Sequence, residues 1–318
     1  MTSPAGQFAI RTDGLTKRFG SQLAVNDVDL RVPPGAVFGF LGPNGSGKTT
    51  TIRLLLGLAS ATSGEIEVLG SRMPGDLGSV LPEVGALVEG PGFYPYLSGA
   101  ANLHRLDTAD RHATSTTRHA RVTTALHRVG LSHATGKKVK AYSLGMKQRL
   151  AIAGALLSPR RLLVLDEPTN GLDPQGTREV RSLIRSLAAE GTTVFVSSHL
   201  LAEIEQICTD AAVMSAGRLV AQGTISELRG VGGARVRLES PDRDAACTVL
   251  ARFGMTVAEP GPDGREIFAS FGVSEPDPDT VVSALVAAEV RVRGFAVERP
   301  SLEQRFVDLT GEGFDVAQ

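Results

Sequence analysis

The sequence predicts an α/β protein in which a mostly parallel sheet, with helices packed on it, is followed by a smaller α+β domain. Short apolar runs end in polar residues at 36–42 and 162–167, and strands buried on both faces have this pattern. Helical patterns, with apolar residues three and four apart, follow these runs at 48–58 and 176–190. The composition changes after residue 229, where the second domain is expected to begin.

Length and composition describe a folded chain of about two domains. Of its 318 residues, 42% are hydrophobic and 21% are charged, close to ordinary globular usage. Cys208 and Cys247 are the only cysteines, too few for a disulfide framework, so we expect a reducing compartment. No apolar run approaches the ~18 residues that cross a bilayer. We therefore expect a soluble, cytoplasmic chain that reaches a membrane only through a partner.

The charges of the chain nearly cancel, with 33 basic and 34 acidic side chains and a net charge of -1. This balance gives no overall electrostatic reason to expect a nucleic acid partner. One segment differs: residues 101–140 hold eight lysines and arginines, but only Asp107 and Asp110 as acids. A solvated helix face is the commonest meaning of such a basic segment.

Residues 98–140 have a helical pattern, with Ser98 as a candidate N-cap and a break near 114–117. Five of the six histidines lie in this segment. They are His104, His112, His119, His127 and His133. A metal site or a pH sensor is one interpretation, but spacings of six to eight residues match no ligand motif, so we favour a solvated face.

The segment after residue 229 has the pattern strand, helix, strand, strand, helix, strand. This order is that of the split βαβ, or ferredoxin-like, arrangement. A turn is expected at 260–264, between the two middle strands. A last helix is expected from Ser301, which forms a candidate capping box with Gln304.

A glycine-rich segment between a predicted strand and a predicted helix fits the phosphate-binding pattern GxxxxGK[ST]. Its glycines let successive N–H groups converge on phosphate oxygens, and the helix adds its positive end. We expect Lys48 to neutralise the β and γ phosphates and the Thr49 hydroxyl to ligate Mg²⁺. The candidate ATP-binding residues here are Gly42, Pro43, Asn44, Gly45, Ser46, Gly47, Lys48, Thr49 and Thr50.

Two carboxylates, Asp166 and Glu167, follow the apolar run LLVL. Phosphoryl transfer needs a held metal and an oriented nucleophile. We expect Asp166 to reach the Mg²⁺ shell and Glu167 to orient or deprotonate the attacking water. Alone, this acidic pair could equally be an ordinary strand end, but downstream of a phosphate loop it favours catalysis.

Four motifs in this order and spacing carry a family resemblance. They are GPNGSGKT (42–49), YSLGMKQRL (142–150), LLVLDEPTNGLDPQG (162–176) and VSSHLLAEIEQICTDAAVMSAGRLVAQG (196–223). Together they resemble the nucleotide-binding subunit of ABC transporters over about residues 8–228. The resemblance implies an ATPase with a mostly parallel core sheet, an antiparallel β part and a helical insert.

The resemblance also assigns roles to residues outside the phosphate loop. It implies that Ser143 and Gly145 close over the γ-phosphate of ATP held by an opposing subunit. Asp173 would communicate across the dimer, and His199 would contact the γ-phosphate. Phe19 lies where the family stacks an aromatic ring on adenine, although a core phenylalanine is the alternative.

The sequence departs from the family pattern at two places. The usual LSGGQ becomes Tyr142-Ser143-Leu144-Gly145-Met146, which keeps the hydroxyl and one glycine. Glu89 stands where the family generally has a glutamine that links Mg²⁺ and water to the membrane subunit. A carboxylate is a hard oxygen ligand, so Glu89 is a candidate Mg²⁺ ligand.

These variants, with the stretch GPGFYPYLSGAANL and the ending PSLEQRFVDLTG, resemble the branch that serves bacterial drug and lantibiotic exporters. The resemblance implies a homodimer that docks on separate membrane subunits, at the cytoplasmic face of the cell membrane. The expected domains are a cassette at 1–228, with a helical subdomain at about 91–142, and a ferredoxin-like domain at 229–318. The expected cofactors are ATP and Mg²⁺.

Two other functions are compatible with parts of the sequence. One is a soluble ABC-type ATPase clamp on nucleic acid or ribosomes, which only the basic segment favours. The other is a regulatory module in which the C-terminal domain senses a small molecule, although no recognisable site is found there. We favour export and expect no nucleic acid partner.

Overall fold

The computed structural model divides the chain into two compact units; the described residues of the first lie within 7–225 and those of the second within 226–298. Within the described residues, no helix is long and apolar enough to span a membrane. Along the chain, the first unit ends and the second begins within the short helix α8 (Ile225–Arg229). The structure describes residues 7–88, 90, 92–110, 112–229, 235–257, 266–271 and 276–298.

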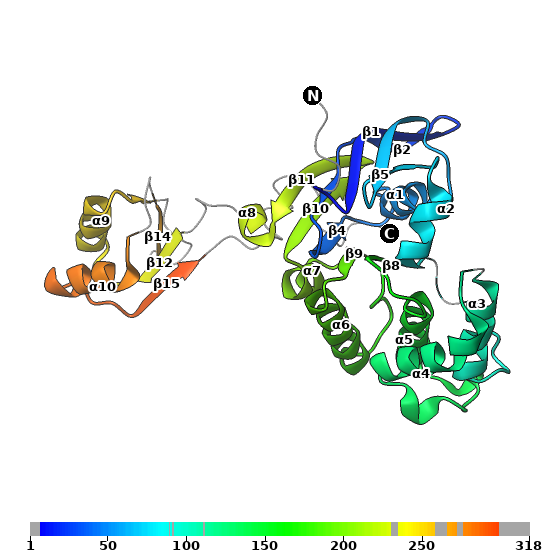
Figure 1. Cartoon of the computed structure of the whole chain (residues 1–318). Coiled ribbons are helices and arrows are strands. Elements are labelled where there is room, and N and C mark those ends of the chain that lie inside the picture. Colours follow the sequence, from blue (N-terminus) through cyan, green and yellow to red (C-terminus); the bar gives the residue numbers. More distant parts are fainter. Residues whose placement is uncertain are drawn as a thin grey trace. The chain divides into compact units, whose positions relative to one another are not determined.

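A six-stranded, mostly parallel sheet forms the centre of the first unit, in the order β11-β10-β4-β9-β8-β7 (Figure 1). Only the pairing of β10 with β11 is antiparallel. The predicted parallel sheet is thereby confirmed. Its strands are β4 (Val37–Leu41), β7 (Val84–Leu87), β8 (Leu162–Asp166), β9 (Thr193–Ser198), β10 (Asp210–Ser215) and β11 (Arg218–Thr224).

A second, antiparallel sheet has the order β2-β1-β5-β6, and β3 also pairs with β1. It meets the central sheet where the N–H of Asn26 donates to the carbonyl of Gly217 at 2.8 Å. This sheet is the antiparallel part that the resemblance implies. Its strands are β1 (Ile10–Phe19), β2 (Gln22–Val28), β3 (Arg31–Val32), β5 (Ser63–Val68) and β6 (Ser71–Met73).

Both faces of the central sheet are buried, because apolar side chains alternate between two separate cores. Leu162 and Val164 of β8 pack into the core shared with the antiparallel sheet and helix α1. Leu163 and Leu165 pack into the core formed with helices α3 to α6. The unbroken apolar run in β8 is thus explained by helices and strands covering opposite faces.

Helices α3, α4 and α5 lie together and contact one another (Figure 1). Ser98 caps α3, as predicted, because its hydroxyl accepts from the N–H of Ala101 at 3.1 Å. The expected break near 114–117 is a 3₁₀ turn, Ser115–Thr117. The helices of this unit are α1 (Lys48–Leu55), α2 (Leu77–Val80), α3 (Gly99–Ala109), α4 (Arg118–Arg128), α5 (Leu144–Ala155), α6 (Pro174–Ala189) and α7 (Leu201–Ile207).

The second unit holds a four-stranded antiparallel sheet in the order β13-β14-β12-β15. Inward side chains of β12 and β14 form its core with α9 and α10. This order of elements is that of the split βαβ arrangement. The expected turn at 260–264 and the helix from Ser301 lie outside the described residues. The elements are β12 (Arg235–Glu239), α9 (Arg243–Arg252), β13 (Thr256–Val257), β14 (Glu266–Ser270), α10 (Pro278–Ala287) and β15 (Gly294–Glu298).

Candidate active site

The phosphate loop connects β4 to α1 and has a shape that only glycines permit. Gly45 and Gly47 have φ values of 80° and 104°, in the region that L side chains rarely adopt. A Cβ atom on Gly47 would lie 2.4 Å from the carbonyl oxygen of Ala24. A Cβ atom on Gly42 would lie 2.5 Å from the carbonyl oxygen of Met214. The loop is thus pressed against two neighbouring backbones, and a side chain at these glycines would displace it.

Polar groups of this loop are arranged for an anion. The Ser46 hydroxyl is buried and has no hydrogen-bond partner, which is costly in a folded protein unless a ligand supplies one. Gly47, at the N-cap of α1, has no side chain to satisfy the first N–H groups of that helix. A Cβ atom on Gly45 would meet no atom within 4 Å, so the loop is open on that side. These features fit a phosphate group.

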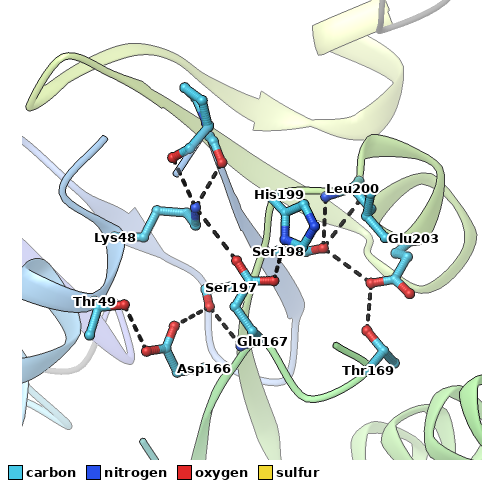
Figure 2. Close-up of polar contacts among 12 residues, drawn as sticks. Lys48, Thr49, Asp166, Glu167, Thr169, Ser197, Ser198, His199, Leu200 and Glu203 are labelled. Carbon is cyan, nitrogen blue, oxygen red and sulfur yellow. Dashed lines mark hydrogen bonds and ion pairs between the residues drawn. The ribbon is translucent and has the colours of Figure 1, made fainter. Parts of the chain in front are cut away.

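Lys48 is buried beside the loop that it follows. Its Nζ atom donates to the carbonyl oxygens of Gly42, at 2.7 Å, and Pro43, at 3.1 Å. It also lies 3.5 Å from Oε1 of Glu167 (Figure 2). Burial lowers the pKa of Lys48, and the Glu167 carboxylate counteracts part of that effect. The Lys48 ammonium group thus lies beside the loop, in contact with two backbone carbonyl oxygens and one carboxylate oxygen.

Asp166, at the end of β8, connects the two predicted motifs. The Thr49 hydroxyl donates to its Oδ2 atom at 2.9 Å. The Ser197 hydroxyl donates to its Oδ1 atom, and the N–H of Glu167 donates to that hydroxyl at 2.9 Å. Hydroxyl and carboxylate oxygens are hard ligands, so the chemistry of Thr49 and Asp166 fits Mg²⁺. The described residues contain no cluster of three or more His, Cys, Asp or Glu side chains that could hold a metal by themselves.

Glu167 and His199 meet although they are 32 residues apart. His199 Nδ1 lies 2.8 Å from Glu167 Oε2, and Lys48 lies on the other side of the same carboxylate (Figure 2). β8 and β9 are paired, which places the residues that follow them at one edge of the sheet. Glu167 has φ of 48°, a left-handed conformation that costs about 1 kcal/mol for a residue other than glycine. Such strain is typical of functional positions.

Ser143 and Asp173 each begin a helix. The Ser143 hydroxyl accepts from the N–H of Met146 at 3.2 Å, and the Asp173 carboxylate accepts from the N–H of Gly176 at 2.7 Å. A Cβ atom on Gly145 would lie 3.7 Å from Gly176, so the two helix starts are neighbours. Among the described residues, no hydrogen bond links Ser143 to the phosphate loop of its own chain.

Phe19 and Glu89 were the remaining candidate site residues, and the structure describes only Phe19. Phe19 is 51% exposed, so the alternative that it is a core phenylalanine is wrong. Lys17 Nζ lies 4.8 Å from the centre of its ring, a cation–π contact. Glu89, the candidate Mg²⁺ ligand, lies outside the described residues.

The basic segment is partly neutralised from within. Asp107 is buried and accepts hydrogen bonds from Arg118 and Arg121. The rings of His104 and His119 stack, with 6.0 Å between their centres. His104 is half-buried, and the other four histidines of the segment are exposed, as expected for a solvated face.

Sequence reasoning missed four residues of this site: Ser197, Ser198, Thr169 and Glu203. Ser197 holds Asp166, while Thr169 and Ser198 donate to the buried Glu203 carboxylate (Figure 2). Ser197 can be identified from the register of β8 and β9, which pairs it with Asp166. A hydroxyl at a strand end has no distinctive sequence pattern, so only the pairing of the strands identifies it.

A phosphate loop between a buried strand and a helix, with an acidic strand end beside it, defines a P-loop nucleotide-binding protein. The chain matches the ABC transporter family over residues 25–170. The bacitracin transport ATP-binding protein BcrA of Bacillus licheniformis is 38% identical, over 96% of this chain and 98% of its own length. The daunorubicin resistance ATP-binding protein DrrA3 of Streptomyces coeruleorubidus is 37% identical, over 96% of both chains.

A solved structure of an ABC transporter ATP-binding subunit covers 70% of this chain and 92% of its own, with 27% identity and a TM-score of 0.62. The structure of cbiO1 from Clostridium perfringens, at 24% identity and a TM-score of 0.64, covers 78% of this chain and 96% of its own and has the same fold. The chain therefore belongs to the ATP-binding proteins of the ABC transporter family, and its first unit is an ABC ATPase cassette.

Proposed function

We propose that this chain is the ATP-binding and ATP-hydrolysing subunit of an exporter, and that it pairs with itself and drives separate membrane subunits. The observation that carries the proposal is the position of Glu167, between Lys48 under the phosphate loop and His199 after β9. The names of the relatives support export of an antibiotic-like compound, since they describe bacitracin transport and daunorubicin resistance. The same names do not support the clamp on nucleic acid.

The roles of the individual residues follow from their chemistry. Lys48 offsets the charge of the β and γ phosphates, and the Ser46 hydroxyl donates to them. Thr49 and Asp166 would hold Mg²⁺, which would supply positive charge beside the phosphates. Glu167 accepts a proton from the attacking water, and His199 fixes the orientation of that carboxylate.

The second active-site surface comes from a second copy of the chain. Ser143 is exposed at the start of α5, where it is free to approach a phosphate held by the partner. Leu144 is 51% exposed beside it, and Leu200 is 46% exposed beside His199. In the proposed dimer, the other copy of the chain covers both leucines. Contacts to the γ-phosphate exist across the interface only when the dimer is closed, so ATP favours closure and ADP does not.

The membrane subunit docks, in our proposal, on a groove between the sheet and the α3–α5 helices. A cavity of about 390 Å³ lies there, lined by Leu87, Phe93, Leu106 and Arg160 among others. Phe93 packs against the helical core, while Tyr94 is 56% exposed. We propose that the docked chain lies at the cytoplasmic face of the membrane, with the partner next to the residues that follow β7.

The proposed base is tested by the substitution Glu167→Gln. Removing a general base lowers hydrolysis by about 10²- to 10⁴-fold, while the Lys48 and loop contacts that bind nucleotide remain. Phosphate release and nucleotide affinity are measured on the same preparation. Phosphate release at the wild-type rate would contradict the assignment of Glu167, and loss of nucleotide binding would show that Glu167 is needed for an earlier step.

A further inference from the structure

A buried carboxylate lies behind the Glu167–His199 pair. Glu203, in the first turn of α7, is 7% exposed. Its Oε2 atom accepts a hydrogen bond from the Thr169 hydroxyl at 2.5 Å and another from the Ser198 hydroxyl at 3.1 Å (Figure 2). A carboxylate so far from water is costly unless its lone pairs are occupied, and these two hydroxyls occupy one oxygen.

The other oxygen of Glu203 faces a cation. Arg181 Nη2, from the middle of α6, lies 3.4 Å from Oε1. α6 is the helix that begins at Asp173. One carboxylate thereby connects three separate elements: the loop after β8, the end of β9, and α6.

The two hydroxyls that Glu203 holds adjoin the reacting pair. Thr169 is two residues after Glu167, and Ser198 directly precedes His199. The Ser198 hydroxyl also accepts from the N–H of Leu200 at 3.0 Å, which fixes the backbone on the other side of His199. The Thr169–Glu203–Ser198 bridge thus forms a second connection between the two segments that carry Glu167 and His199, whose side chains are 2.8 Å apart.

We propose that Glu203 is a positioning residue for hydrolysis: through Thr169 and Ser198 it holds the loop of Glu167 and the loop of His199 at a fixed separation. The inference rests on the proposed function of Glu167. Glu203 has no contact with the phosphate loop among the described residues, so it acts on the rate of the chemical step and leaves nucleotide binding unchanged. A displacement of about 1 Å in a reacting group lowers rates by as much as 10²-fold.

The test compares two substitutions at Thr169 in the full-length chain. Thr169→Val removes the hydroxyl and keeps the shape of the side chain, and we expect kcat to fall about tenfold with KM for ATP within about twofold of wild type. Thr169→Ser restores the hydroxyl and removes only a methyl group, so it recovers most of that rate. A purely structural role for Thr169 predicts that Thr169→Val loses ATP affinity and thermal stability as well as kcat.

Glu203→Met, which has no oxygen acceptor, and the double variant Thr169→Val/Glu203→Met complete a double-mutant cycle with Thr169→Val. Both single changes break the same bond, so the double variant is expected to be no slower than the slower single variant. If Thr169→Val does not fold, Ser198→Ala tests the other half of the bridge by the same kcat and KM measurements.

A wild-type kcat in Thr169→Val or in Ser198→Ala, or additive losses in the cycle, would overturn the role of Glu203. Glu167→Gln, assayed beside these variants, distinguishes this failure from that of the proposed function. If Glu167→Gln is inactive and the Thr169 and Ser198 variants turn over normally, only the role of Glu203 is wrong. If Glu167→Gln itself turns over normally, the proposed function fails.

Discussion

Glu167 has a cation on one side and an imidazole on the other, because three chain segments end at the same edge of the sheet. Lys48 is 3.5 Å from one carboxylate oxygen and His199 is 2.8 Å from the other. We expect a phosphate bound at the loop to compete with Glu167 for the Lys48 ammonium. Lys48 is therefore shared between the proposed nucleotide site and the proposed base.

Lys48→Ala tests the nucleotide-binding half of this arrangement. Charge-assisted hydrogen bonds contribute about 1.5–3 kcal/mol each, so we expect nucleotide affinity to fall at least tenfold. A titration with a fluorescent ATP analogue measures it. Arg72→Ala is the matched control, since Arg72 is a 74% exposed cation outside the loop, and it is expected to bind like wild type. Equal affinities for wild type and the Lys48 variant would contradict the phosphate contact.

At the residue scale, the sequence predicted five of the side chains that meet at the site. Lys48, Thr49, Asp166, Glu167 and His199 are brought together by hydrogen bonds and ion pairs. The hydroxyls that orient them could not be predicted, because a serine or threonine at a strand end has no spacing of its own. Their partners are set by strand register and by the packing of α7, which only the folded chain determines.

At the scale of elements, α3 and α4 are joined by one buried ion pair network. Asp107 has a side chain with no exposed surface, and it accepts from Arg118 and Arg121. The hydrogen bond from Arg121 is the main cause that lowers the pKa of Asp107 below its ordinary value. The fold places this acid among the arginines of the basic segment, so those two cations serve the packing of helices.

The stability of the protein should therefore depend on Asp107 in acid. A carboxyl whose pKa is lowered on folding stabilises the native state above its unfolded pKa, which is about 3.9, and loses that contribution as pH falls through the lower folded value. Asp107→Asn leaves two partly buried arginines without their carboxylate and is expected to cost about 3 kcal/mol near neutral pH.

Thermal unfolding of wild type and Asp107→Asn, measured from pH 7 to pH 2, checks this expectation. The difference between the two midpoints should shrink below about pH 4, as Asp107 of the wild type takes up a proton. A difference that stayed constant over the whole range would contradict the role of the carboxylate charge.

The helices and the buried strands were the elements that periodicity could predict, including the Ser98 cap and the break before α4. Which strands pair in parallel could not be derived from periodicity alone. The antiparallel sheet was implied only by the family resemblance, since an exposed alternating strand is compatible with several partners. The register that opposes Asp166 and Ser197 depends on the whole sheet.

At the scale of the molecule, the proposed function needs two partners, a second copy and a membrane subunit. The proposed docking of the membrane subunit can be tested at Leu106, in the groove between the sheet and the α3–α5 helices. Leu106 is 46% exposed and lines the 390 Å³ cavity, so Leu106→Glu places a charge where an apolar partner would dock.

We expect this variant to hydrolyse ATP like wild type in solution and to bind membrane vesicles from the source cells much more weakly. Leu58→Glu is the matched control, because Leu58 is 66% exposed and does not line that cavity. Flotation of the chain with the vesicles measures the difference. Equal flotation of the two variants would exclude the groove as the docking surface.

The central claim is that nucleotide bound at the loop of one chain is enclosed by the Ser143 segment of another. The most direct measurement is the molar mass of Glu167→Gln by light scattering, with saturating ATP and Mg²⁺ and again with ADP. We expect the mass of two chains with ATP, the mass of one chain with ADP, and the mass of one chain with ATP when Ser143 is also replaced by a bulky residue. A variant that binds ATP fully yet keeps the mass of one chain would contradict it.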